Sequence, residues 1–441
     1  MIDLHLHLDG SLNPDNILHM AGMSQISLPC EDKDELYRQL KVSPYCSNLS
    51  EYLEKFVLPL QVLQTGECIE YAVYELLRDV YSQGLCYVEI RFAPQLHTKA
   101  HLTQDEAVSA AVKGLKRGTT DFDIKAQLIL CCMRNNSNHK ENEETVRMAL
   151  KYLGNGVCAI DLAGNEAAYP TGDFADIFRQ AASEGIPFTI HAGEAAGAES
   201  VWKALELGAV RIGHGIRSAS DKALMDTLSE KGIYLEMCYS SNMQTHAVDK
   251  SQDYPLRLFI DRDVNVTINT DNMTVSGTTL KREYQILQKQ FAFTENELKS
   301  LALNSAYAAF SQQLMAEEQR QEIVNCKKKE SMYGFFQKCV ASDKCVILVS
   351  DMYLPEQVII KMLEKCGIAG YDDIYISNCY NSNKLTGKLF ELVMDERGTD
   401  RKKIIHIGDS VKADYIGARK AGIRSILIGR KNRLKRQLNS K

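Results

Sequence analysis

Phe188-Thr-Ile-His191-Ala-Gly-Glu194 is a short apolar run that ends at a histidine, two small residues and a carboxylate. It follows Gly185-Ile-Pro187, and its β-branched and aromatic residues predict a buried strand with His191 and Glu194 at the carboxyl end. A barrel of parallel strands carries its chemistry at that end. This spacing suits a metal ligand and a general acid or base, and it equally suits the start of a helix. Residues at the ends of other strands must decide between the two.

Seven further segments have the same strand-like character. Each is separated from the next by enough chain for a helix, which is the signature of parallel βα units. The eight predicted strands cover residues 1–8, 87–94, 125–134, 157–164, 188–191, 210–215, 233–239 and 264–271. We therefore predict a (β/α)₈ TIM barrel over residues 1–315, with one helical stretch over 47–82 and closing helices over 280–293 and 295–314.

The first strand alternates apolar and polar residues, so His5 and His7 project from one face. Two imidazoles on one face can close on a metal ion, or they can belong to a half-exposed strand that binds nothing. His214 and Asp271 lie at the carboxyl ends of two later predicted strands. Those ends converge on one mouth in a barrel, so the first interpretation is favoured.

Three imidazoles and one carboxylate form a ligand set that suits zinc or a similar metal. A metal ion there would lower the pKa of a bound water from about 16 towards 7. Glu194 would exchange protons beside that water. His214, which lies between two glycines, would orient or stabilise the hydroxide rather than complete the ligand shell.

Six short motifs follow one another along the chain. They are His5-x-His7-Leu-Asp-Gly, Cys131-Cys-Met-Arg134, Asp161-Leu-Ala-Gly164, His191-Ala-Gly-Glu194, Gly213-His214-Gly215 and Asn269-Thr-Asp271. In this order they resemble the motifs of adenosine deaminases, a family of metal-dependent hydrolases. The resemblance extends over about residues 1–315.

The resemblance implies a role for each matching position. The zinc ligands, one ion per chain, would be His5, His7, His191 and Asp271. Glu194 would protonate the purine nitrogen beside carbon 6 while hydroxide attacks that carbon, and His214 would hold the attacking oxygen. Gly164 would offer its backbone N–H to the base, and Asp9 would accept the ribose 5′-hydroxyl. Adenosine or 2′-deoxyadenosine would become inosine or its deoxy form plus ammonia, a reaction of purine salvage.

Two positions depart from the family pattern. Asn272 stands where eukaryotic members have a second aspartate, which donates a hydrogen to the imidazole-ring nitrogen of the purine. An asparagine amide always carries two donors, so we expect purine recognition to persist. Tyr239 stands where such deaminases often have proline, so the shape of that loop is not carried over.

Three functions remain open at this point. Adenine deaminases tend to have a glutamate at the position of Asp9, and the shorter side chain leaves space for a sugar. The apolar stripe Leu53, Phe56, Val57 and Leu60 is either a cover for the ribose or plain core. Besides an adenosine deaminase, we consider a deaminase of adenine or another 6-aminopurine, and a non-catalytic nucleoside-binding or scaffold protein.

Residues 316–330 are rich in charge and predict a linker, and residues 331–441 predict an open α/β sheet of a second unit. This unit resembles haloacid dehalogenase-like hydrolases at Ser350, Lys384, Asp409 and Asp414. It lacks the Asp-x-Asp strand that supplies their nucleophile. We therefore expect an incomplete, Rossmann-like unit that is not catalytic.

Composition excludes several other classes. The chain has 441 residues and a formal net charge of −5, which argues against a surface that coats nucleic acid. It has no apolar run long enough for a membrane span and no basic leader, so we expect no membrane association. Its thirteen cysteines form no CxxC pair, which predicts a reducing compartment, the cytoplasm. The expected partner is a small molecule, adenosine; the oligomeric state is not predicted.

Overall fold

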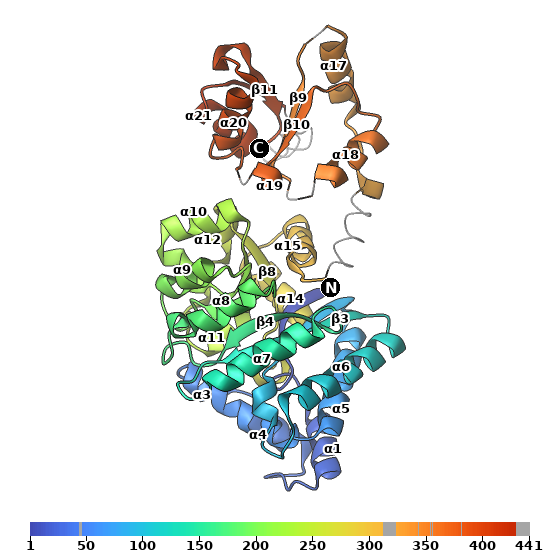
Figure 1. Ribbon diagram of the computed structural model, residues 1–441, viewed down its shortest axis with the longest axis vertical. Helices are drawn as coiled ribbons and strands as arrows, with labels where there is room; N and C mark the ends of the chain where they lie inside the picture. Colours follow the sequence, from blue (N-terminus) through green and yellow to red (C-terminus); the bar gives the residue numbers. More distant parts are fainter. Residues whose placement is uncertain are drawn as a thin grey trace. The chain divides into compact units, whose positions relative to one another are not determined.

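Two units make up the chain, Met1–Met315 and Ala316–Lys441. The structure is a computed structural model that describes residues 1–43, 46–311, 323–342, 344–352, 354, 356–380 and 382–428. The first unit runs from blue to yellow in Figure 1, and the second is orange to red. Residues 316–322 of the expected linker, and the basic end of the chain from 429, lie outside the described residues.

Eight parallel strands form the first unit. They are β1 (Ile2–His7), β2 (Tyr87–Phe92), β3 (Lys125–Met133), β4 (Val157–Ala163), β5 (Thr189–Ala192), β6 (Arg211–His214), β7 (Tyr234–Met237) and β8 (Asn265–Ile268). They pair in the orders β1-β2-β3-β4 and β5-β6-β7-β8. Bridges between Ile160 and Phe188 and between Leu6 and Asp271 join β4 to β5 and β8 to β1. The predicted (β/α)₈ barrel is confirmed.

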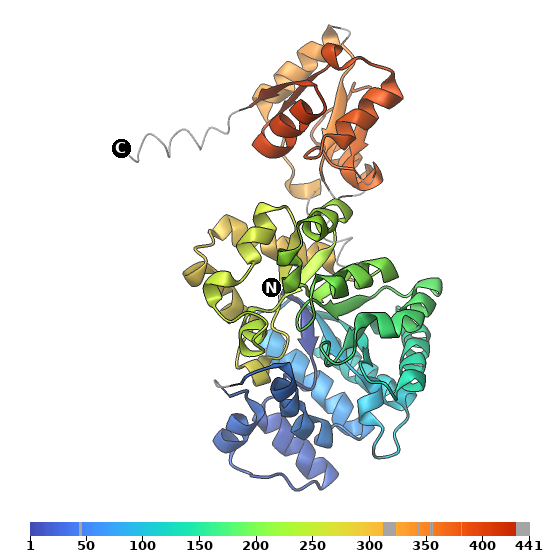
Figure 2. The same cartoon turned by 90° about the vertical axis from the view of Figure 1, so that its left-hand side faces the viewer.

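Helices surround these strands, as the turned view in Figure 2 shows. They are α1 (Pro14–Ser24), α2 (Lys33–Leu40), α3 (Leu49–Leu53), α4 (Val57–Val62), α5 (Gly66–Ser82), α6 (Gln104–Asp121), α7 (His139–Tyr152), α8 (Ala175–Ser183), α9 (Ala198–Leu207), α10 (Lys222–Lys231), α11 (Tyr239–Gln244), α12 (Leu256–Asp261), α13 (Met273–Ser276), α14 (Leu280–Gln290) and α15 (Glu295–Ala308). Local chemistry sets their starts: the Asn13 side chain caps α1, and Thr294 with Glu297 forms a capping box on α15.

The helical stretch expected over residues 47–82 is wrong in one respect. It consists of α3, a 3₁₀ turn over Glu54–Phe56, α4, and then α5, which begins only after Thr65. Leu63 has φ −94° and ψ 41°, which ends α4, and Thr65 accepts a hydrogen bond from the amide of Cys68 as a new N-cap. The apolar spacing continues across the break, so periodicity alone did not reveal it.

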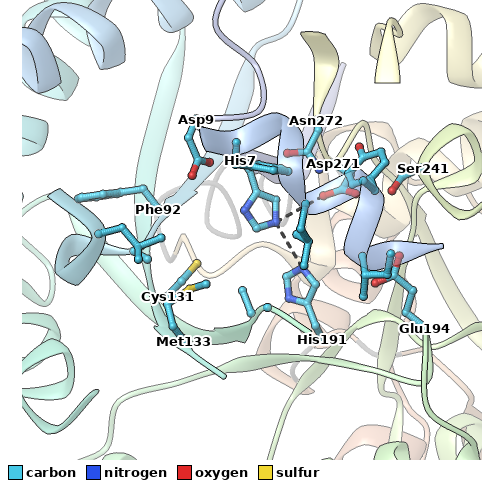
Figure 3. Close-up of a pocket in the computed structure, with 18 of the residues that line it drawn as sticks. His7, Asp9, Phe92, Cys131, Met133, His191, Glu194, Ser241, Asp271 and Asn272 are labelled. Carbon is cyan, nitrogen blue, oxygen red and sulfur yellow. Dashed lines mark hydrogen bonds and ion pairs between the residues drawn. The ribbon is translucent and has the colours of Figure 1, made fainter. Parts of the chain in front are cut away.

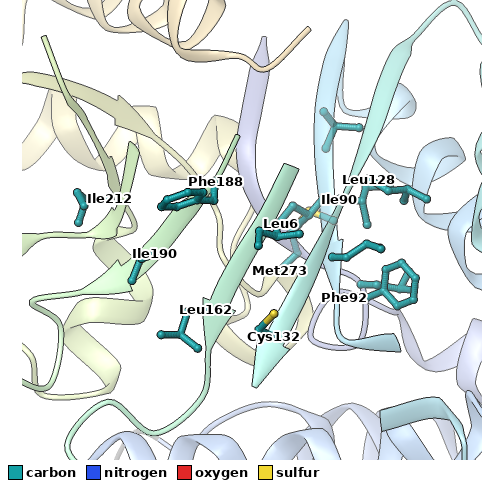
Figure 4. Packing of buried hydrophobic residues seen from close by; sticks show 14 of the residues in the cluster. Leu6, Ile90, Phe92, Leu128, Cys132, Leu162, Phe188, Ile190, Ile212 and Met273 are labelled. Atoms are coloured by element: carbon teal, nitrogen blue, oxygen red, sulfur yellow. The ribbon is translucent and has the colours of Figure 1, made fainter. Parts of the chain in front are cut away.

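Side chains on the barrel strands alternate between two environments. Leu6, Ile90 and Ile190 pack in the hydrophobic core between strands and helices (Figure 4). The alternate positions are polar, and Arg91 and Arg211 are among the largest fully buried side chains. β1 is buried along nearly its whole length, so the half-exposed interpretation of this strand is wrong. The barrel interior is therefore a polar site rather than an apolar core.

The end of α15 seals the barrel opposite the histidines. Ala306, Ala308 and Ala309 pack against Ile2 and Leu4 of β1. The carbonyl of Ala308 accepts a hydrogen bond from Arg211 at 2.8 Å, and the amide of Phe310 donates to Glu89 at 2.7 Å. The chain up to about residue 311 thus belongs to the barrel.

The second unit contains α17 (Glu330–Ala341), α18 (Glu356–Lys365), α19 (Ser377–Tyr380), α20 (Lys388–Arg397), α21 (Ala418–Lys420) and strands β9 (Ile347–Ser350), β10 (Asp373–Ile376), β11 (Ile405–Gly408) and β12 (Arg424–Leu427). Within the described residues the strands form two separate parallel pairs, β10-β9 and β11-β12, rather than one open sheet. The sequence lacks the nucleophile-bearing strand that the resemblance places at the centre, and the two pairs are in contact through side chains, since Val349 of β9 packs against the cluster of Phe390, Ala418 and Ile423. Across the described part of the chain, no helix is both long and apolar enough to cross a bilayer.

Candidate active site

The structure brings the four expected metal ligands together at the mouth of the barrel, and Figure 3 shows three of them, His7, His191 and Asp271. His7 Nε2 lies 3.3 Å from His191 Nε2 and 3.4 Å from Asp271 Oδ1. His5 Nε2 lies 3.4 Å from the same oxygen of Asp271. A tetrahedral zinc site with bonds of about 2.0–2.1 Å separates its ligand atoms by about 3.4 Å. The distances from His7 to His191 and Asp271, and from His5 to Asp271, match that spacing.

His5 gives an independent sign that a ligand belongs there. Its Nε2 is buried and has no hydrogen-bond partner, which is costly for a polar atom inside a protein. Its Nδ1 is engaged, at 2.7 Å from Glu236 Oε2. A metal ion beside Nε2 would satisfy the atom left over. The residues present therefore fit the metal that the sequence motifs imply.

His214 also stands beside this position. Ligand atoms of His5, His191, His214 and Asp271 all lie within 4.8 Å of one another. Gly213 permits the crowding, because a Cβ there would come within 3.2 Å of the His5 ring and 3.1 Å of the His191 Cα. His214 and Asp271 both adopt positive φ angles, 60° and 61°. Such backbone strain in residues other than glycine gathers at functional sites.

A buried layer of charges holds the histidines in orientation. Asp161 Oδ2 lies 2.9 Å from His191 Nδ1, and Glu236 takes the equivalent place beside His5. Arg91 joins the two carboxylates, at 2.9 Å from each. Burial raises the pKa of Asp161, but the neighbouring His191 and Arg91 outweigh it and hold that pKa below its ordinary value. This layer fixes the ring nitrogens that face the metal position.

Sequence reasoning assigned no role to Arg91, Asp161 or Glu236. The available signal was a charged residue at alternate positions of otherwise apolar strands, as in Tyr87-Val-Glu-Ile-Arg91 and Ile233-Tyr-Leu-Glu236. Such positions face the barrel interior and require partners. The pattern predicts that partners exist, but it does not say which ones.

Glu194 lies at the pocket wall beside His214. Its Oε2 is 3.6 Å from His214 Nε2, and its Oε1 accepts a hydrogen bond from Thr245 Oγ1 at 3.2 Å. Burial, together with the charges of Asp271 and Glu166, raises the pKa of Glu194 to about 8. Glu194 therefore carries a proton at neutral pH and can act as an acid.

His214 is neutral for a comparable reason, since burial lowers its pKa well below the ordinary value. Asn242 Oδ1 accepts from the Tyr254 hydroxyl at 3.2 Å, which leaves Asn242 Nδ2 to donate to His214 Nδ1 at 2.9 Å. In this arrangement the proton of the ring is on Nε2, the nitrogen that faces Glu194. His214 can then donate a hydrogen bond to an oxygen in the site.

A pocket with about 660 Å³ of space not filled by protein opens onto these groups. All three expected substrate-binding residues, Asp9, Gly164 and Asn272, line it. Burial raises the pKa of Asp9 to about 6. Asn272 Oδ1 is buried without a hydrogen-bond partner. The pocket thus presents one polar atom without a partner and a buried carboxyl on a largely apolar wall, as ligand sites do.

The apolar stripe after the first strand divides between pocket and solvent. Leu53, Phe56 and Leu60 line the pocket, joined by Leu49 and Tyr52. Val57 is 58% exposed and does not line it. The stripe is therefore a cover over the pocket rather than plain core, except at Val57.

The residues expected as a degenerate second site come together only in part. Lys384 Nζ lies 2.6 Å from Asp414 Oδ1, and His406 Nε2 lies 3.0 Å from the same oxygen. Ser350 accepts from the amide of Met352 in its own turn, and Asp409 directly follows β11. The lysine expected to face a phosphate is thus paired with a carboxylate.

Comparison with known proteins agrees with this geometry. The family model for adenosine deaminase matches residues 1–326, and a model for haloacid dehalogenase-like hydrolases matches 346–428. An adenosine deaminase of Haemophilus ducreyi is 49% identical over 314 residues, covering 70% of this chain and 91% of the relative.

Solved structures show the same fold. An adenine deaminase from Arthrobacter aurescens has a TM-score of 0.65 and 29% identity, covering 70% of this chain and 93% of that one. An amidohydrolase from Burkholderia ambifaria, solved with bound zinc, has a TM-score of 0.65 and 21% identity, covering 73% and 88%.

Fold and site together define a deaminase-type hydrolase, built on a (β/α)₈ barrel with a cluster of histidines and an aspartate able to hold a metal ion. Within that class, the chain belongs to the adenosine deaminase family.

Proposed function

We propose that this chain catalyses the hydrolytic deamination of adenosine and 2′-deoxyadenosine, with one zinc ion held by His5, His7, His191 and Asp271. The observation that carries the proposal is the place of Glu194. It is a buried carboxyl whose pKa is raised to about 8, on the wall of a pocket that is also lined by Asp9, Gly164 and Asn272, beside the only cluster of its kind that the described residues form.

Zinc, when bound, supplies a water whose pKa is lowered from about 16 towards 7, and hence a nucleophile at neutral pH. Glu194 donates its proton to the ring nitrogen beside carbon 6, which makes that carbon electrophilic. His214 donates a hydrogen bond from Nε2 to the attacking oxygen. Of the two protons of the water, one would restore the carboxyl of Glu194, which has passed its own proton to the ring nitrogen, and the other would leave with the amino group as ammonia.

Three residues recognise the substrate in this proposal. Gly164 presents its backbone N–H to the pyrimidine edge of the purine, Asn272 donates from its amide to the imidazole edge, and Asp9 accepts the 5′-hydroxyl of the ribose. Asn272 sits against Gly10, where a Cβ would approach the Asn272 Oδ1 to 1.9 Å. The absence of a side chain at Gly10 therefore leaves room for this amide.

The residues that line the pocket favour a nucleoside as the substrate over free adenine and over a nucleoside monophosphate. Leu49, Leu53 and Phe56 form an apolar wall beyond the polar residues, which gives a sugar a surface that free adenine would leave empty. Among the residues that the structure describes, no lysine or arginine lines the pocket, whereas phosphate recognition relies on such cations. Asp9 would repel a 5′-phosphate. Adenine and nucleoside monophosphates are therefore poorer substrates in this proposal.

The second unit takes no part in the reaction. It lacks the Asp-x-Asp nucleophile, and its Lys384 is engaged by Asp414. All thirteen cysteines of the chain are free thiols, which supports the cytoplasm as the compartment.

The test compares adenosine, adenine and adenosine monophosphate as substrates, each with the zinc-loaded and the chelated protein. We expect adenosine to have the highest kcat/KM, activity to disappear with chelation, and zinc to restore it. Faster turnover of adenine than of adenosine would show that the chain is an adenine deaminase instead. Turnover of none of the three, by folded protein with zinc bound, would overturn it.

A further inference from the structure

The turn that carries Glu194 is held by a carboxylate outside the pocket. Glu166 follows β4 by three residues and is only 2% exposed. Its carboxylate accepts hydrogen bonds from four successive backbone amides, those of Gly193, Glu194, Ala195 and Ala196, at 2.7, 3.0, 2.7 and 3.0 Å. Its negative charge also helps to raise the pKa of Glu194, but the proposed mechanism gives this side chain no direct contact with the substrate.

The backbone shape explains why four amides can share one carboxylate. Gly193 has φ +70°, in the left-handed region, which turns the following N–H groups to one side. Successive amides arranged in this way form an anion-binding concavity. A Cβ on Gly193 would come within 2.6 Å of Val201 Cγ2, so this turn requires glycine. The turn runs directly into α9, whose positive N-terminal end adds to the attraction.

Glu166 is also tied to the strand end that carries His191. Ser200 Oγ donates to Glu166 Oε1 at 2.5 Å and lies 2.8 Å from Thr171 Oγ1. Arg134 donates to Thr171 Oγ1 at 3.0 Å and to the carbonyl of His191 at 2.6 Å. One connected hydrogen-bond network therefore contacts the backbone at both ends of the stretch from His191 to Glu194, at the carbonyl of His191 and at the amides that follow it.

We propose that Glu166 is a positioning residue for the deamination, acting through Glu194. It fixes the backbone from which the Glu194 side chain extends, and so sets where that carboxyl meets the base. This inference rests on the proposed function. A misplacement of a reacting group by about 1 Å costs about 10²-fold in rate, so a small relaxation of the turn should be visible in kcat.

The first test is Glu166→Gln. The glutamine side chain keeps the shape of glutamate but has only one acceptor oxygen. If its NH₂ group takes the place of Oε2, the hydrogen bonds from the backbone amides of residues 194–196 are lost. If it takes the place of Oε1, the hydrogen bonds from Gly193 and Ser200 are lost. We expect kcat to fall by about 10²-fold, with zinc content and the KM for adenosine nearly unchanged. Glu283→Gln is the matched control. Glu283 is as deeply buried and accepts from the amide of Ser240 and from the hydroxyl of Thr278.

Both variants should lower Tm, because each removes hydrogen bonds to a buried carboxylate. Only Glu166→Gln should lower kcat in folded, zinc-loaded protein. Wild-type kcat in that variant, with only Tm reduced, would mean a purely structural role and would overturn the inference. If Glu166→Gln does not fold, Ser200→Ala removes one donor and should lower kcat in the same direction by a smaller factor; an unchanged kcat there is equally contrary.

A double-mutant cycle tests whether Glu166 acts through Glu194. In a Glu194→Gln background, Glu166→Gln should cause little further loss of kcat, because the group that it positions is already inactive. If the losses of kcat in the two single variants multiply in the double variant, Glu166 does not act through Glu194.

Amide hydrogen exchange over residues 191–197 gives a readout that does not require turnover. Exchange should speed up in Glu166→Gln and stay unchanged in Glu283→Gln. If the wild type fails to deaminate adenosine, the proposed function fails while the exchange result still tests Glu166. If the wild type is active and both exchange and kcat are unaltered in Glu166→Gln, only this inference fails.

Discussion

Asp161 Oδ2 lies 2.9 Å from His191 Nδ1, and both side chains are buried inside the barrel. The contact turns the other nitrogen of His191 towards His7, 3.3 Å away. Arg91 Nη1 contacts the same oxygen of Asp161, also at 2.9 Å. The orientation of a proposed metal ligand is therefore set by a residue that would not touch the metal.

Asp161→Asn should weaken zinc binding by about 10–100-fold, the usual effect of losing such a partner. The neutral amide no longer compensates the charge on the metal through His191. A competition titration with a chelator measures the affinity. Asp176→Asn, on the exposed face of α8, is the control. Equal zinc affinity in both variants would show that Asp161 does not support the site.

Glu194→Gln should leave zinc bound and reduce kcat by about 10²–10⁴-fold, the range for loss of a general acid. The amide fits the same space but has no carboxyl proton to transfer. Metal analysis and steady-state kinetics provide the two measurements, with the exposed Glu184→Gln as control. Retained turnover would remove Glu194 from the chemistry.

The rate should depend on pH through the same carboxyl. Its pKa is raised to about 8, and the protonated form is the one that reacts. We expect kcat/KM, which reports ionisations of the free enzyme, to be level below about pH 7 and to fall about tenfold per unit well above pH 8. A profile of kcat/KM measured from about pH 6 to about pH 10 checks this. A level profile up to the alkaline end contradicts the assignment.

Phe56→Ala should raise the KM for adenosine by about tenfold, since roughly 1–2 kcal/mol of apolar contact is lost over the sugar. Turnover of adenine should be unaffected, because it has no sugar to cover. Val57→Ala is a close control: it lies next in the chain but is 58% exposed and outside the pocket. Equal effects of the two substitutions would argue against a cover.

Residues 1–315 expressed alone should deaminate adenosine with the kcat/KM of the full chain. This range contains the segment that closes the end of the barrel. In that segment the carbonyl of Ala308 accepts a hydrogen bond from Arg211, and the amide of Phe310 donates one to Glu89. Solubility and kinetics of the shortened chain are the measurements. An insoluble or inactive product would show that the second unit supports the barrel.

Much of the barrel could be predicted because its signals are local. The period of two in a strand fixes that His5 and His7 share a face, and short apolar runs between helices mark each strand. The break after Leu63 escaped prediction, since the apolar spacing runs through it. The second unit is the incomplete α/β unit that was expected, but within the described residues its strands form two parallel pairs rather than one open sheet.

By itself the sequence determined the order of strands and the residue types at their ends, since side-chain direction along a strand depends only on neighbouring residues. Tertiary structure alone decided which groups meet across the barrel. Glu166 lies 27 residues before Gly193, yet it accepts that residue's amide at 2.7 Å. Barrel closure and the left-handed turn at Gly193 create this contact, and no spacing in the sequence encodes it.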